Sequence, residues 1–113
     1  MKSDRMRRVD EAVREVLSDA ISTELKDPRV GFVTVTAVDT APDLRHAKVF
    51  VSVLGHAGER ARSMDGLRSG HGYLQNRVAR ELRLKHTPTL TFVYDDTAER
   101  AQRLERLLGQ EPE

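Results

Sequence analysis

Cysteine is absent from this 113-residue chain, which excludes disulfide bonds and thiolate metal sites. No apolar run approaches the roughly 18 residues that a membrane-spanning helix needs. The first residues lead into an amphipathic pattern rather than an unbroken apolar stretch, which is unlike a secretory signal peptide. We therefore predict a soluble, cytoplasmic protein that does not associate with a membrane.

A strong net charge is also absent, because 19 Lys and Arg residues face 18 Asp and Glu residues. Hydrophobic residues make up 38% of the chain and occur in periodic runs, which is unlike a disordered protein. The length predicts one domain with a modest core. The chain contains no internal repeat and no low-complexity segment, so a solenoid or a repeat array is not expected.

The motifs of common enzymes are missing as well. The chain has no phosphate-binding loop, no His-Glu-x-x-His pair and no nucleophile elbow. Asp95 and Asp96 could form a carboxylate pair, but their place between a predicted strand and a predicted helix favours helix capping. The four histidines share no metal-ligand spacing: His46, His56, His71 and His86. We therefore predict a protein without enzymatic activity, bound metal or cofactor.

The first predicted element is a long helix over residues 4–25, with Ser3 as its N-cap and Pro28 beyond its end. Its other face alternates in charge, which favours a solvated surface over a binding surface. Apolar residues at steps of three and four form one stripe along this helix: Met6, Val9, Val13, Val16, Leu17, Ala20 and Ile21.

Alternating β-branched residues then predict strands over 32–38 and 46–54, and a third strand over 90–94. The loop between the first two is short, so they should pair as an antiparallel hairpin. One face of the second strand is apolar throughout, with Ala47, Val49, Val51 and Val53. The opposite face of the sheet carries Thr and Lys residues and is expected to face water.

Helical patterns fill the rest of the chain. A weak pattern through Ala61, Met64 and Leu67 is broken at residues 69–72, and a stronger helix follows over 73–84. Asp96 and Glu99 have capping-box spacing and predict a last amphipathic helix before a frayed end at 109–113. The predicted class is α+β, with a domain over residues 1–95 and a C-terminal helix and tail over 96–113.

Positive charge is concentrated in residues 66–86, which hold five basic residues against the single acid Glu81. On a helical wheel of residues 73–84, Leu74, Val78, Ala79 and Leu82 fall on one side. Arginine forks to phosphate oxygens, and tyrosine stacks on bases, so the other side predicts RNA or phosphate binding over an ordinary solvated face. That side carries Tyr73, Asn76, Arg77, Arg80 and Arg83.

The break Gly70-His71-Gly72 lies directly before this helix. Glycine allows another backbone to approach closely, and a helix N-terminus offers free N–H groups to an anion. A kink is the more common reason for such a pair of glycines, and we interpret the break as a kink that aims the basic face rather than as a phosphate clip. Together with the basic face, the break gives the following predicted RNA-binding residues: Arg68, Gly70, His71, Gly72, Tyr73, Asn76, Arg77, Arg80, Arg83 and Lys85.

Three stretches resemble the ribosome-binding factor A family, a group of bacterial small-subunit maturation factors. They are Glu-Leu-Lys-Asp-Pro-Arg at 24–29, the strand entry and strand at 43–55, and the segment from Leu84 to Asp95. They occur in the order and at the spacing of the family, over about residues 3–108. The resemblance implies a type-II KH-like fold, with the order α-β-β-α-α-β before the C-terminal helix.

The resemblance also implies a function. It implies a monomer that binds the free small (30S) ribosomal subunit, contacts its 16S ribosomal RNA, and assists late maturation and processing near the 5′ end. In bacteria the family is linked to growth in the cold. Two positions depart from the family pattern: Gly70 replaces the usual Ala at the kink, and Gln75 replaces a basic residue. Arg77 is the expected substitute for that lost phosphate contact.

A second hypothesis comes from another class of protein. The chain could be an interaction module that docks a partner protein through the edge of its hairpin or through its C-terminal helix. Sensitivity to salt and to ribonuclease would favour RNA binding, and indifference to both would favour a protein partner. A small hydrolase ranks third, because no catalytic constellation is visible.

Overall fold

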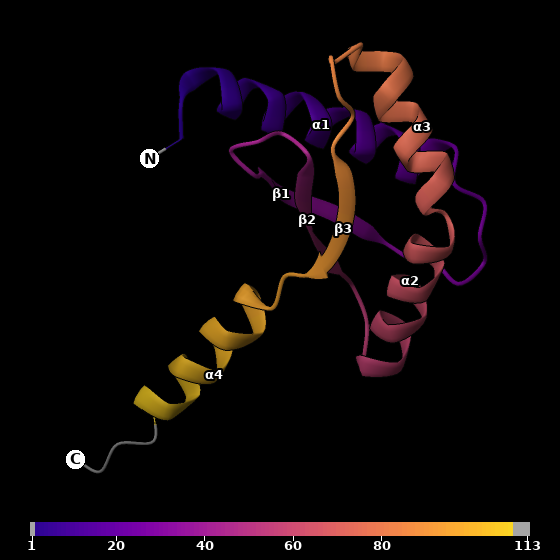
Figure 1. The fold of residues 1–113 in the computed structure, drawn as a ribbon. Helices are drawn as coiled ribbons and strands as arrows, with labels where there is room; N and C mark the ends of the chain where they lie inside the picture. The colour runs from indigo at the N-terminus through magenta and orange to yellow at the C-terminus, as the bar shows by residue number, and fades with distance from the viewer. Residues whose placement is uncertain (1, 110–113) are drawn as a thin grey trace.

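Four helices and one sheet follow each other as α1, β1, β2, α2, α3, β3 and α4 in the computed structural model, which describes residues 2–109 (Figure 1). The predicted α+β class is confirmed. The predicted frayed tail lies mostly at 110–113, outside the described residues. No helix within residues 2–109 is both long and apolar enough to cross a membrane.

Helix α1 spans Asp4–Thr23 and begins where the sequence predicts. The Ser3 hydroxyl accepts a hydrogen bond from the Met6 amide at 3.2 Å, so the predicted N-cap is confirmed. Five residues of the apolar stripe are buried, and Met6 and Val9, near the helix start, are half-buried. A polar contact fixes that end, because Asp10 Oδ1 accepts from the Thr40 amide at 2.9 Å.

The sheet has the order β1-β2-β3, with β2 (His46–Val53) in the centre. Strand β1 (Val33–Thr40) pairs with β2 in the predicted antiparallel manner. Strand β3 (Thr89–Tyr94) runs parallel to β2. A parallel neighbour needs a long crossover, and the chain makes it through helices α2 and α3.

A bulge interrupts β1 between Val35 and Ala37. Two residues on a bulged strand face one residue on the partner, so the inward-facing set changes parity. Val35 is buried before the bulge, and Val38 and Thr40 are buried after it. The strand therefore continues to Thr40, two residues beyond its predicted end.

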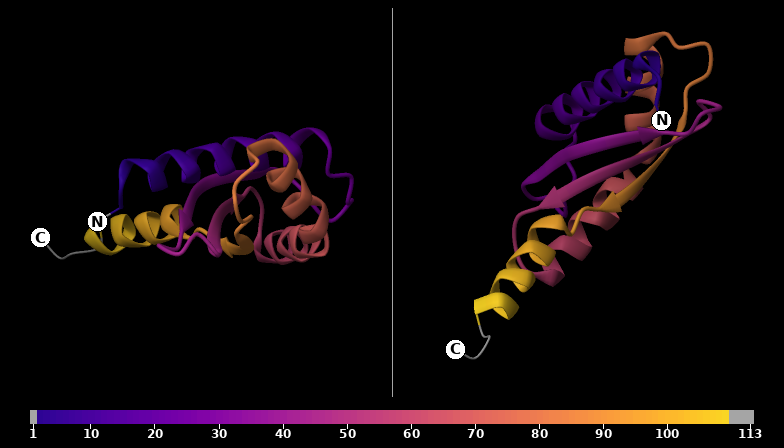
Figure 2. Two further views of the ribbon diagram at one scale, coloured as in Figure 1. Left: turned by 45° about the horizontal axis from the view of Figure 1, so that its top comes forward. Right: turned by 90° about the vertical axis from the view of Figure 1, so that its left-hand side faces the viewer.

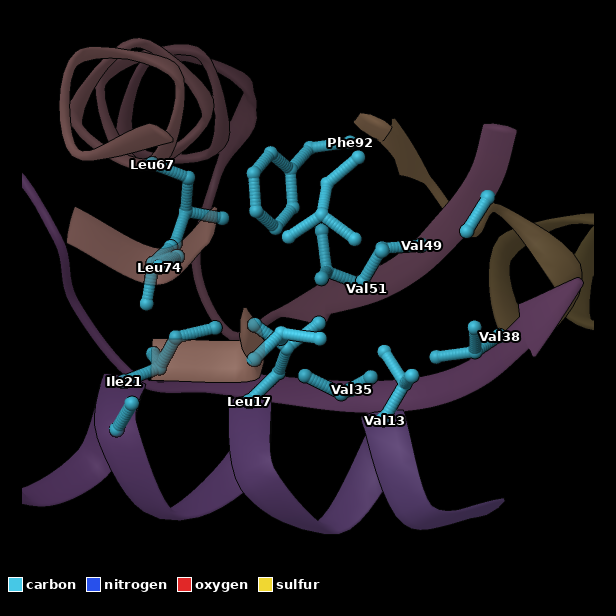
Figure 3. Close-up of a cluster of buried hydrophobic side chains, with 14 of the residues drawn as sticks. Val13, Leu17, Ile21, Val35, Val38, Val49, Val51, Leu67, Leu74 and Phe92 are labelled. Atoms are coloured by element: carbon cyan, nitrogen blue, oxygen red, sulfur yellow. The ribbon is translucent and has the colours of Figure 1, made fainter. Parts of the chain in front are cut away.

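The core lies between the sheet and helices α1, α2 (Ala57–Ser69) and α3 (His71–Leu82). Figure 3 shows Leu67 of α2 and Leu74 of α3 pointing toward the same cluster as Leu17 of α1. The predicted apolar face of β2 is buried throughout, whereas Ala61, predicted to share the inner face of α2, is exposed. The opposite face of the sheet is open, with exposed Thr34, Thr36, Lys48 and Thr91.

Helix α4 (Thr97–Gly109) projects away from this body, and none of its residues is buried (Figures 1 and 2). The radius of gyration is 16.1 Å. A compact chain of this length would have about 13 Å, so the projecting helix lengthens the molecule. The predicted capping box is wrong: Asp95 Oδ1 accepts the Thr97 amide at 3.0 Å, and Glu99 bonds to Tyr94 and Arg60 instead.

Candidate nucleic-acid interface

Helices α2 and α3 meet at Gly70, which ends the first and begins the second. Its backbone is not left-handed (φ −84°, ψ 8°), so glycine is not required there for conformation. A Cβ at Gly70 would lie 2.8 Å from Leu25 Cδ1, in the segment that follows α1. Gly70 is therefore used for close internal packing, and replacing it would require Leu25 to move.

Gly72 differs from Gly70 in its packing. It lies in the first turn of α3, which begins at His71 rather than at the predicted residue 73. Among residues 2–109, a Cβ at Gly72 would meet no atom within 4 Å, and no side chain caps the N-terminus of α3. An outside partner can approach this turn closely, so the predicted role of a glycine at the break fits Gly72 better than Gly70.

Two side chains of α3 fasten the helix to strand β3. His71 Nε2 lies 3.0 Å from the Leu90 carbonyl oxygen. The Gln75 amide donates to the Pro88 carbonyl at 2.6 Å and accepts from the Leu90 amide at 3.1 Å. Gln75 is thus a structural link between α3 and the start of β3, and one ring nitrogen of His71 is already engaged.

Arg77 does not lie on the outward face, and that part of the prediction is wrong. Its side chain is only 12% exposed and forms an ion pair with Glu24. Its Nη2 also lies 3.4 Å from Asp19 Oδ2 of α1. A helical wheel contains no information about a neighbouring helix, and here α1 presents carboxylates to α3. Arg77 is therefore not available to replace the lost phosphate contact.

The other four residues predicted to face outward, three in α3 and its C-cap residue Arg83, do form one exposed stripe. We call it the α3 stripe: Tyr73, Asn76, Arg80 and Arg83. Their spacing of three, four and three residues places them on one helical face. Arg83 ends the helix in the left-handed conformation (φ 48°, ψ 41°), and exposed Lys85 follows it. Arg68 of α2 is also exposed, and its Nη2 lies 3.4 Å from the Phe92 carbonyl oxygen.

The exposed basic residues of the predicted site lack acidic partners in the described structure. Within residues 2–109, no ion pair involves Arg68, Arg80, Arg83 or Lys85. In the same range, no group of three or more His, Asp or Glu side chains is placed to hold a metal ion. The arrangement can bind an anion by charge and hydrogen bonding, and its one aromatic, Tyr73, is 42% exposed.

Sequence reasoning missed one part of the basic surface. It assigned the charges of α1 to a solvated face, yet Arg5 at the start of α1 lines the same cleft as Lys85 and His86. These residues are about 80 positions apart in the sequence, and only the fold brings them together. No periodic pattern could have signalled this proximity.

The ribosome-binding factor A family model matches residues 5–108 of the chain. The chain is 44% identical over 108 residues to ribosome-binding factor A of Halothermothrix orenii, covering 96% of this chain and 88% of that protein. It is 49% identical over 102 residues to the protein of the same name from an Anaeromyxobacter species, covering 89% and 84%.

Solved structures agree with these matches. A putative ribosome binding factor A of Thermotoga maritima is 30% identical, with a TM-score of 0.73, over 82% of this chain and 89% of that chain. A model of Thermus thermophilus ribosome binding factor A, fitted into the cryo-EM map of a 30S complex, is 25% identical with a TM-score of 0.64, over 78% and 92%. On the family match and these identities, the chain belongs to the ribosome-binding factor A family.

Proposed function

We propose that this protein is a ribosome-binding factor that associates with the free small ribosomal subunit and contacts its 16S ribosomal RNA. The contact surface is the α3 stripe together with Arg68 and Lys85. One observation carries the proposal: exposed basic side chains without acidic partners in residues 2–109 share a surface with an exposed tyrosine. The 30S complex of the Thermus thermophilus relative supports the ribosome as the target.

The proposed mode of binding follows from the chemistry of these groups. Arg80 and Arg83 fork to phosphate oxygens, and Tyr73 stacks on an unpaired base. Gly72 lies in the first turn of α3, where no described side chain caps the helix and no described atom would meet a Cβ, so a phosphate can approach this turn closely. This use of a glycine-containing junction between two helices is KH-like. The hydrogen bonds of His71 and Gln75 hold α3, and with it the charged surface, against the rest of the fold.

The proposed mechanism involves no chemical step by the protein. A monomeric, cytoplasmic factor would bind one conformation of the immature RNA more tightly than others and so shift its population. Late maturation and processing near the 5′ end would then proceed from that conformation. The link of the family to growth in the cold is consistent with this role, because misfolded RNA conformations persist longer at low temperature.

A triple variant tests the surface: Arg80→Gln, Arg83→Gly and Lys85→Gln. Glycine is chosen at 83 because it tolerates the left-handed backbone. Losing three phosphate contacts should weaken co-sedimentation with 30S subunits and make the log–log salt dependence shallower by about 2. Arg77 is left intact, since its removal would leave Glu24, the C-cap residue of α1, without its charge partner.

A matched control removes the same charge elsewhere, through Arg7→Gln, Arg8→Gln and Arg106→Gln, all at exposed positions. Circular dichroism and thermal unfolding should be the same for both variants. Normal 30S binding by the triple variant, or an equal loss in the control, would contradict the assignment of this surface.

A protein-interaction module is the second candidate. One observation favours it: Leu104, Leu107 and Leu108 of α4 are 58%, 62% and 60% exposed. Ribonuclease treatment separates the two functions, because it should release an RNA-bound protein and leave a protein-bound one in place. Release by moderate salt would also favour RNA binding, because salt screens the contacts between basic side chains and phosphates.

A further inference from the structure

We propose that the protein has a second RNA contact, a cleft at the end of the molecule where α3 finishes, which takes one unpaired nucleotide. The inference rests on the proposed RNA-binding function and extends it to residues outside the α3 stripe. The cleft has a volume of about 130 Å³. We call it the tip cleft, and its walls come from the start of α1, the β1–β2 loop and the loop from α3 to β3. The right-hand view of Figure 2 shows the two loops at the same end of the molecule.

The walls of the tip cleft are fixed by backbone hydrogen bonds. The Thr89 amide donates to the Arg45 carbonyl oxygen at 2.8 Å and joins the two loops. Leu44 has a left-handed backbone (φ 60°), and its amide donates to the Ala41 carbonyl oxygen at 2.8 Å. Asp43 Oδ1 accepts from the Arg45 amide at 3.0 Å. A ligand would therefore meet a preformed site, which reduces the entropy lost on binding.

The interior of the tip cleft is apolar and its rim is basic. Val9, Leu44 and Leu84 line it and are half-buried. Arg5, Lys85 and His86 line it as well, and all three are exposed. Within residues 2–109 neither Arg5 nor Lys85 forms an ion pair. The single acidic residue of the lining, Asp43, is engaged with the Arg45 amide.

This combination fits a nucleotide better than other small groups. Sites for drug-sized ligands have volumes of about 300 Å³ or more, so the tip cleft admits only something near the size of one flat ring. A base has apolar faces for the interior, and its phosphate carries the negative charge that the rim would attract. Arg45 is exposed beside the cleft and adds a further cation for the neighbouring phosphate.

The tip cleft is also continuous with the α3 stripe. The stripe ends at Arg83, whose left-handed backbone turns the chain out of the helix. Only Leu84 separates it from Lys85 on the rim. A single strand that follows the stripe from Tyr73 to Arg83 would therefore reach the cleft without leaving basic surface. Together with an apolar interior that accepts the face of a base, this continuity favours single-stranded RNA as the occupant over an acidic peptide.

The test uses the full chain and a tip variant that leaves the α3 stripe and Lys85 intact: Arg5→Gln, Arg45→Gln and His86→Gln. Its control is Arg7→Gln with Arg8→Gln. The control also removes two arginine charges, but from exposed positions of α1 outside the cleft lining. Binding to a fluorescent single-stranded oligoribonucleotide and to 30S subunits is titrated at several salt concentrations. The tip variant should bind about five- to tenfold more weakly, with a salt slope shallower by about 1, and the control should be unchanged.

The outcomes separate this inference from the function on which it rests. If the double variant Arg80→Gln with Arg83→Gly, which keeps Lys85, loses binding and the tip variant does not, only the tip cleft is wrong. If that double variant also binds normally, the RNA-contact surface of the proposed function fails as well. Ultraviolet crosslinking of the wild-type complex should label peptides from residues 41–45 or 84–88, and labelling confined to α3 would overturn the inference. Equal competition by oligoglutamate would overturn it too, because the cleft would then select charge alone.

Discussion

Helices α1 and α4 carry similar amphipathic patterns but lie in opposite surroundings. Helix α1 buries five residues against the sheet and α3, whereas α4 buries none. The apolar stripe of α4 faces solvent, with three leucines more than half exposed. An amphipathic pattern therefore predicts that a segment forms a helix, but not that its apolar face finds a partner in the same chain.

Polar contacts, rather than apolar packing, join α4 to the body. Arg60 of α2 lies 3.2 Å from Glu99 Oε1, and its guanidinium lies 5.2 Å from the centre of the Tyr94 ring. The Tyr94 hydroxyl donates to the same Glu99 carboxylate. This hydrogen bond is the main cause that lowers the pKa of Glu99. We call Arg60, Tyr94 and Glu99 the α4 latch.

The largest expected effect contrasts a leucine of the body with one of α4. Leu74→Ala should lower the free energy of unfolding by about 2–5 kcal/mol, because Leu74 is fully buried and its truncation leaves a cavity. Leu107→Ala removes the same atoms from an exposed site and should change it by less than about 0.5 kcal/mol. Urea denaturation measures both. Similar costs for the two variants would show that α4 packs against the body in solution.

The body is also the part of the fold that the sequence predicted well. Alternation in β2 and three- and four-residue steps in α1 report burial directly, since each strand or helix has one face against the core. Leu74 and Val78 of α3 are buried as the helical wheel predicts. The Ser3 cap and the antiparallel hairpin depend on neighbours close in sequence, and both are confirmed.

Errors in the site occur where contacts are distant in sequence. Arg77 pairs with Glu24, 53 positions away, so no local pattern could place its guanidinium inside the α1–α3 interface. Gln75 reaches Pro88 and Leu90 on the next strand for the same reason. The α3 stripe survives as an exposed surface, because nothing in the described structure lies over that face of α3.

A smaller effect is expected from breaking the α4 latch. Tyr94→Phe combined with Glu99→Gln removes the hydroxyl and the charge that meet Arg60. Partly exposed ion pairs contribute little, so the free energy of unfolding should fall by less than about 1 kcal/mol. The orientation of α4 should change more than stability does. Backbone ¹⁵N relaxation should show α4 tumbling more independently of the body than in the wild type.

Arg100→Gln is the control for the latch, because it breaks an exposed pair between Arg100 of α4 and Asp96, which directly precedes the helix, and leaves the latch intact. Its relaxation data should match those of the wild type. If the double variant also matches the wild type, the contacts among Arg60, Tyr94 and Glu99 do not determine the orientation of α4. Another contact would then have to join α4 to the body.

The smallest expected effect belongs to the body and disappears in acidic solution. Asp27 lies in the segment after α1, where its carboxylate receives hydrogen bonds from the Arg29 side chain and amide. These bonds, led by the side-chain contact, lower the pKa of Asp27 from 3.8 to about 2. A carboxyl whose pKa is lower in the folded state stabilises the fold when ionised. Its contribution is therefore complete above about pH 4 and is lost as the pH falls toward 2.

Asp27→Asn removes that titration while keeping the shape of the side chain. The variant should be slightly less stable than the wild type at neutral pH, and the difference should shrink between pH 4 and pH 2, as the wild-type carboxyl becomes protonated. Thermal unfolding of both proteins at half-unit pH steps measures this convergence. Relaxation of α4 should be the same in both proteins, because Asp27 contacts only the body. A stability gap that stays constant down to pH 2 would mean that the Arg29 contact does not act through the charge of Asp27.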